Sequence, residues 1–314
     1  MSPPSGRPPI AAWRALHAFL VDAARPSSAS ILRAAGVIAW VESQPVAAIA
    51  LLVCGFCYLL AAAVLVAAAA LAAAQPTIAA ALKATTPVML TPLAVIAGLL
   101  IVFLAARVWG NLDRANALLA QEAGAVRELV LLAGALPPGD VRTALRGDVR
   151  TYLRFVDAED FPAMAAGRAD PGPPPGLAEA MGALLAFAPA TPGQQTLRER
   201  AVAAAEEAMG ARRGRVLLSR AEIAPIQWLV VVVLDALILL VIAMVHIDRR
   251  LTAAANLFVF STAMAACLVL LMAYDRPFSP GGFTVQPRAL REIGAERAPR
   301  RATLTWPPSA PGRA

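Results

Sequence analysis

Four long apolar runs occur along the chain, and most charged residues lie outside them. The runs extend from about Val46 to Ala74, Val88 to Trp109, Ile226 to Ile247 and Ala253 to Tyr274. Each is long enough to cross a bilayer, because a spanning helix needs about 20 residues at a rise of about 1.5 Å per residue. Pro45, Pro87 and Pro225 precede three of the runs, where a missing N–H costs a helix nothing. The pattern predicts four transmembrane helices in two hairpins.

The block between the hairpins, residues 111–224, has the apolar spacing of helices. Apolar side chains from Leu112 to Ala133 recur every three or four residues until Leu136-Pro137 stops the pattern. A second helix is expected after Asp140, a suitable amino-terminal cap, with one apolar face from Val141 to Val156. The first half of the block therefore predicts two helices.

The second half of the block is divided by a stiff linker rich in Pro and Gly at residues 170–176. After it we expect a short helix near Leu177 to Phe187 and a longer one from about Gln194 to Ile223. No alternating run is long enough for a sheet. The predicted fold class is therefore an all-α membrane protein. Its five parts are an amino-terminal extension (1–44), a first hairpin (45–110), a cytoplasmic helical domain (111–224), a second hairpin (225–275) and a basic, Pro-rich tail (276–314).

Composition supports a membrane protein. Of the 314 residues, 59% are apolar and 16% are charged, with a mean hydropathy of +0.63, whereas soluble domains have about 45–50% and about 25%. This excludes a purely soluble globule. The basic residues are 27 Arg and one Lys in a chain rich in Ala, Gly and Pro, which is typical of a GC-rich bacterial genome.

The basic residues also predict orientation. Lys83 lies between the first pair of runs, and Arg249 and Arg250 lie between the second pair, whereas the other 25 of the 28 basic residues lie on the opposite side. Basic residues next to membrane spans favour the cytoplasmic side. We therefore expect a multi-pass protein of the bacterial inner membrane with both termini and the middle block in the cytoplasm.

Charge outside the spans limits the partners. The middle block has 13 Arg against 14 acidic residues, so it has no basic face for nucleic acid. The tail after Tyr274 has seven Arg against three acidic residues, which favours contact with anionic lipid head groups; disorder from Ala298 onward is the alternative. In the extension, Trp13, Leu16 and Leu20 have helical spacing, typical of an interfacial helix or of a helix packed on the middle block.

Asp235 lies near the middle of the third span, where a carboxyl group costs about 2.5 to 3.5 kcal/mol. It must therefore face protein or water. Ser261 and Thr262 fall at a similar depth in the fourth span, so one interpretation is a hydrogen bond between the two helices. The other is a protonatable or cation-facing site in a permeation path. An ionised Asp235 in a narrow pore would repel anions.

The second span carries a candidate constriction. Ile96, Leu100 and Phe103 share a helical face, which either packs on lipid and other helices or gates a pore by dewetting. Cys54 and Cys57 lie well inside the first span, where a thiolate is disfavoured, so we expect packing side chains and no redox pair. With three Cys, two His and no catalytic or phosphate-binding motif, the sequence predicts no enzyme, no metal site and no cofactor.

Several local motifs resemble the bestrophin-like domain family of bacterial membrane proteins. They are Ala115-Asn116-Ala117-Leu118, Glu122, Leu136-Pro137, Leu145-Arg146, Arg150-Thr151-Tyr152, Asp160-Phe161-Pro162-Ala163-Met164, Arg215-Val216-Leu217-Leu218-Ser219, Pro225, Trp228, Leu270 to Phe278, Phe283-Thr284-Val285 and Pro287. Phe161 stands where the family usually has Trp. The resemblance implies four spans, a cytoplasmic helical domain and a homo-oligomer, such as a pentamer, around an anion pathway. A non-conducting scaffold whose cytoplasmic helices bind a protein partner is the alternative.

The exit from the last span, Asp275-Arg276-Pro277-Phe278, is the most distinctive of these motifs. Pro277 stops the helix, Arg276 complements its carboxyl end and the head groups, and Phe278 is expected to anchor in the membrane interface. A regulatory contact with the middle block is the alternative role.

Overall fold

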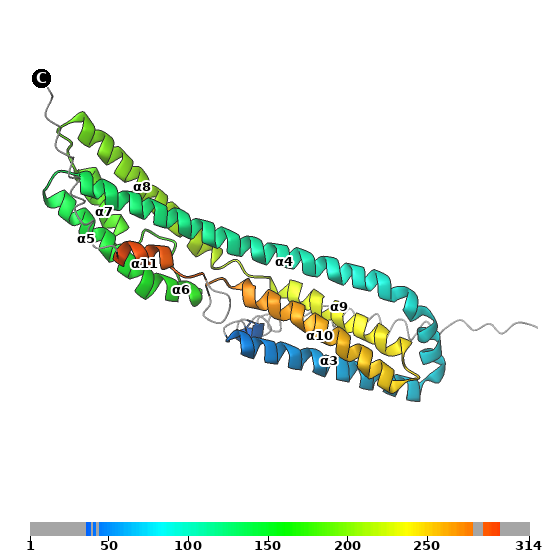
Figure 1. Ribbon diagram of the computed structural model, residues 1–314. Coiled ribbons are helices and arrows are strands. Elements are labelled where there is room, and N and C mark those ends of the chain that lie inside the picture. Colours follow the sequence, from blue (N-terminus) through cyan, green and yellow to red (C-terminus); the bar gives the residue numbers. More distant parts are fainter. Residues whose placement is uncertain (1–35, 39, 42–43, 279–284, 296–314) are drawn as a thin grey trace, which may run out of the picture. The chain divides into compact units, whose positions relative to one another are not determined.

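The computed structural model describes residues 36–38, 40–41, 44–278 and 285–295 (Figure 1). The described residues form helices and connecting turns, and they include no strand. The elements are α3 (Val46–Ala74), α4 (Pro76–Ala135), α5 (Asp140–Phe155), the π-helical turn η1 (Val156–Asp160), α6 (Phe161–Ala165), α7 (Leu177–Ala186), α8 (Pro192–Leu218), α9 (Pro225–Val245), α10 (Arg250–Asp275) and α11 (Arg288–Ala295). The predicted all-α class is confirmed. The interfacial helix expected around Trp13 lies outside the described residues.

The chain divides into two compact units. The first unit contains residues up to Trp109 and from Glu222 to Phe283, and the second contains Gly110–Ala221 and the residues from Thr284 onward. The helix α4 contributes its first part to the first unit and its last part to the second. Of the segment expected as a basic tail, the described residues 285–295 group with the second unit.

The first unit is built on α3, α9 and α10, which pack against one another. Its core consists of two hydrophobic clusters, to which α4 adds side chains such as Leu104 and Ala97. Four helices in the described part, α3, α9, α10 and the portion of α4 from Pro87 onward, are long and apolar enough to cross a membrane. Lys83 of α4 forms an ion pair with Asp248, between α9 and α10.

Helix α4 corrects the sequence prediction at both ends of the second span. We expected a loop before Pro87 and separate helices before and after residue 110, but one helix of 60 residues continues from Pro76 to Ala135. Pro87 and Pro92 lie inside it, and Figure 1 shows the start of α4 bent against its remainder. Proline kinks a helix because it lacks an N–H and clashes with the preceding turn, yet membrane helices tolerate it.

The second unit follows the predicted apolar faces. On α5, the expected face buries Leu145, Val149 and Tyr152, and this helix packs against α7, which in turn packs against α8. Helix α8 ends at Leu218 and not near Ile223 as expected. A turn and a short irregular segment, residues 219–224, follow it before α9 begins. The short α11 packs on α5, and its Arg291 forms an ion pair with Asp157 of η1.

Candidate functional site

The apolar face of α4 is the first candidate site. In the apolar window of α4 only 11% of the residues are buried within the chain, against 50% for α9 and 39% for α10. Ile96 and Phe103 are 54% and 64% exposed, whereas Leu100 is half-buried and packs against the core of the first unit. The three side chains therefore do not share one environment. Ile96 and Phe103 face away from the chain's own core, where another copy or lipid can contact them.

Asp235 is the second candidate, and α9 places it on the buried side of that helix. The residue is 1% exposed, and Ser261 on α10 is fully buried. The expected hydrogen bond between the two helices at this depth is not found: neither Oδ1 of Asp235 nor Oγ of Ser261 has a partner among the described residues. Thr262 instead bonds to the hydroxyl of Tyr58 on α3, at 3.0 Å, and donates to the carbonyl of Phe258.

The exit from α10 forms a junction with the segment that leads into α9. The carboxylate oxygens of Asp275 accept from the backbone N–H of Ile223 at 3.1 and 3.2 Å, and Arg276 forms a 2.9 Å ion pair with Glu222. Phe278 is 6% exposed, so it packs within the protein; its expected place at the membrane interface stays a prediction. The motif thus anchors two chain segments of the first unit to each other.

A buried ion cluster in the second unit was not predicted. It consists of Glu122 on α4, Asp160 at the end of η1, and Arg212 and Arg215 on α8, all at most 2% exposed. Arg215 bridges the two carboxylates, with nitrogen to oxygen distances of 2.8 Å to Glu122 and 3.0 Å to Asp160. Arg212 meets Asp160 at 2.7 Å. Two guanidinium groups therefore balance two carboxylates inside the unit.

Neutral groups complete the ion cluster. Arg212 donates to the backbone carbonyls of Asp170 and Gly172, which fixes the Pro- and Gly-rich linker. The hydroxyl of Tyr152 donates to Glu122 at 2.6 Å. Arg215 lies 4.7 Å from the ring centroid of Phe161, which is a cation–π contact.

The ion cluster shifts the pKa of two of its members. Burial by itself disfavours the charge on Arg215, but Glu122 and Asp160 outweigh it and raise the pKa of Arg215 above its usual value. Burial, followed by the nearby Glu122 carboxylate, raises the pKa of Tyr152 well above its usual value. Both groups are therefore held in their protonated forms, and the arrangement is suited to joining helices rather than to proton transfer.

The sequence contained one signal for this ion cluster. Glu122, Tyr152, Asp160 and Arg215 all belong to the motifs that carry the family resemblance. Their mutual contacts span up to 93 positions of sequence separation, so no helical spacing could reveal them. The cluster could be predicted from the sequence by pairing the acidic and basic residues that occur in these motifs.

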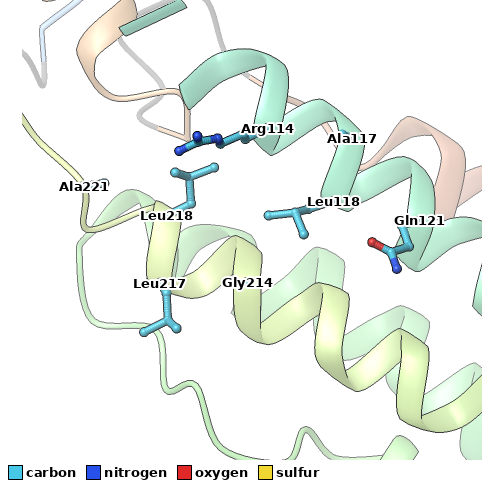
Figure 2. A pocket seen from close by; sticks show the side chains of 8 residues that line it. All are labelled: Arg114, Ala117, Leu118, Gln121, Gly214, Leu217, Leu218 and Ala221. Carbon is cyan, nitrogen blue, oxygen red and sulfur yellow. The ribbon is translucent and has the colours of Figure 1, made fainter. Parts of the chain in front are cut away.

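The second unit also has an apolar groove of about 560 Å³ between α4 and the end of α8. Figure 2 shows Leu118 from α4 and Leu218 from α8 lying between the two helices. Leu217, at the rim, is 55% exposed. The groove is close-packed at its floor, where a Cβ on Gly214 would lie 3.0 Å from Leu118.

Comparison with known proteins identifies the family. A scan against protein families matches residues 55–290 to the Bestrophin-like domain. Searches of curated proteins and of solved structures found no match. The matched segment covers α4 to α10 and most of α3, so it includes three of the four apolar helices whole and most of the other one. The chain is therefore a membrane protein that belongs to the bestrophin-like family.

Proposed function

We propose that this protein is an oligomeric ion channel, selective for anions, whose pore is surrounded by the membrane segment of α4 from several copies. The observation that carries this proposal is the low burial of that segment within one chain, 11% of its apolar window. A helix that buries so little of itself has surface available for other copies. Membership of the bestrophin-like family supports the anion as the permeant ion.

The chemistry of α4 is compatible with anions. Between Lys83 and Arg107 the helix has no acidic residue, so its exposed face has no fixed negative charge to repel them. The one acidic residue near mid-membrane, Asp235, is buried among other helices. Phe103 and Ile96, seven positions apart on one face, would form a hydrophobic constriction that gates by dewetting. No reaction is assigned to the protein, which acts without a cofactor.

Flux measurements test the channel directly. Full-length protein reconstituted in liposomes is expected to conduct chloride, and Phe103→Ala is expected to change the rate several-fold by widening the constriction. Phe56→Ala is the matched control, because Phe56 is 46% exposed on α3 and has no place at the pore. Silent vesicles that contain folded oligomers, or equal effects of the two variants, would contradict the proposal.

The distribution of basic residues supports a place in the bacterial inner membrane, with the second unit and both termini in the cytoplasm. Arg107 and Arg276 lie at one end of the spans, whereas the opposite loops have only Lys83, Arg249 and Arg250. Protease added outside intact cells is expected to leave residues 111–224 uncut. Cleavage there without cell lysis would reverse the orientation.

A non-conducting scaffold is the second candidate, and the groove in Figure 2 favours it. Its wall of Ala117, Leu118 and Leu218 is apolar, which suits an apolar helix of a protein partner. Leu217→Glu at the rim distinguishes the two candidates. If the groove is the functional site, this variant abolishes partner crosslinking, and chloride flux is absent in both forms of the protein.

A further inference from the structure

The core of the first unit changes composition at one level of the helix bundle. Helices α3, α9 and α10, which lie side by side in Figure 1, each contribute to both hydrophobic clusters. The boundary between the clusters falls between Cys57 and Ala61 on α3, between Val231 and Ile238 on α9, and between Leu257 and Met264 on α10. The layer between these positions therefore contains no buried apolar side chain from the three helices, although half-buried Phe260 packs against both clusters.

Two polar side chains occupy this layer and have unfilled hydrogen-bonding capacity. Asp235 is midway between Val231 and Ile238, and Ser261 is midway between Leu257 and Met264. They are 1% and 0% exposed, and within the described chain Oδ1 of Asp235 and Oγ of Ser261 have no hydrogen-bond partner. Two such orphans at one level of a close-packed bundle are unusual, because buried polar atoms are almost always paired.

In the described part of the chain, the helices that contribute to the two clusters supply no Lys or Arg to this layer, and α4 has none between Lys83 and Arg107. The spans around the two residues, 225–245 on α9 and 251–271 on α10, have no Lys or Arg, and neither does α3. The titratable group on α3 that interacts electrostatically with Asp235 is Cys57. On α10, the residues at this level include Ser261 and Thr262. An ionised carboxylate without a partner is very costly in such surroundings.

We propose that Asp235 and Ser261 form a proton-binding site within each chain, in which the protonated carboxyl shares one internal water molecule with the Ser261 hydroxyl. The carboxylate takes up one proton from solvent, and no other bond changes. A water molecule supplies both a donor and acceptors to groups too far apart to bond directly. The site lies inside one chain's bundle, so it does not depend on whether the assembled protein conducts ions.

Infrared spectroscopy of the full-length protein in lipid tests the proton. The wild type at neutral pH is expected to show the C=O stretch of a protonated carboxyl, absent from Asp235→Asn. Asp248→Asn is the matched control, since that carboxyl is exposed and paired with Lys83, and it is expected to keep the band. Ser261→Ala is expected to shift the band, because the hydrogen bonding of the carboxyl changes.

Isotope-labelled Asp in wild-type protein gives the same readout if Asp235→Asn fails to fold. A labelled spectrum with no protonated carboxyl at neutral pH overturns the proposal. A thermal unfolding midpoint that rises when sodium replaces choline at constant ionic strength also overturns it, because a metal cation would then occupy the layer. A high-resolution cryo-EM map is expected to show water density between Asp235 and Ser261. A map with no density between them would contradict the shared water.

Discussion

The two units of this protein bury carboxylates in opposite ways. In the second unit, Glu122 and Asp160 are each bound by guanidinium groups at 2.7 to 3.0 Å. In the first unit, Asp235 is buried to the same degree but has no basic residue near it in its helices. This difference indicates that burial alone does not determine the protonation state of a carboxyl group. The partners decide whether charge or a proton is the less costly form.

Removing one charge from the ion cluster should have the largest effect. Glu122→Gln leaves two buried Arg side chains against Asp160 alone, and breaking a buried pair in this way costs about 3 to 5 kcal/mol. We expect a large fall in the thermal unfolding midpoint and faster proteolysis of the second unit. Glu128→Gln, on an exposed position of the same helix, should change neither. Equal stability of the two variants would show that the cluster contributes nothing.

Adding a side chain at Gly176 should disturb the ion cluster almost as strongly as Glu122→Gln. Gly176 has φ +86°, and a Cβ there would lie 2.4 Å from the carbonyl oxygen of Asp148 and 2.5 Å from the backbone nitrogen of Tyr152. Gly176→Ala should therefore displace α5 and cost about 2 to 4 kcal/mol. Gly182→Ala, inside α7 with open space around it, should instead stabilise by up to about 1 kcal/mol. Denaturant unfolding measures both, and a neutral Gly176→Ala would mean that α5 can shift freely.

How much of this fold was predictable follows from the range of each interaction. The helices of the second unit follow from local apolar spacing, and α5 buries the face expected from Leu145 to Tyr152. The continuity of α4 could not be predicted, because Pro87 has the same local signal at a helix start and at a kink. The ion cluster joins residues 30 to 93 positions apart, so local spacing does not reveal it, and only the family motifs that contain its members indicate it. Asp235 could be identified from the sequence, because an acidic residue inside a long apolar run is unusual whatever its partners are.

The hydroxyl of Tyr152 offers a smaller perturbation of the ion cluster with a pH signature. Tyr152→Phe removes a hydrogen bond to a charged group and should cost about 1.5 to 3 kcal/mol at neutral pH. Because the pKa of Tyr152 is raised in the folded protein, the phenol stabilises the fold below its ordinary pKa of about 10. That contribution is lost as the pH rises through the raised value.

Unfolding midpoints of the wild type and Tyr152→Phe between pH 7 and pH 11 measure this difference. The gap between the two proteins is expected to narrow at the alkaline end. Tyr58 is the control position, because its hydroxyl bonds to Thr262 in the first unit, so Tyr58→Phe should not alter the alkaline behaviour of the second unit. A gap that stays constant to pH 11 would contradict the role assigned to the phenol.

The smallest effect is expected from the same carboxyl-to-amide change in the first unit. Asp235→Asn keeps the shape and polarity of a neutral carboxyl, so it should change stability by less than about 1 kcal/mol, within the range of a weak hydrogen bond in a membrane bundle. Asp235→Leu removes the polar group and leaves Ser261 alone with its unfilled hydrogen bond, which should cost more. Thermal unfolding of both variants beside Glu122→Gln makes the comparison direct. If Asp235→Asn were as destabilising as Glu122→Gln, an ionised carboxylate would be required in the membrane layer, and the two units would bury their acids by the same means.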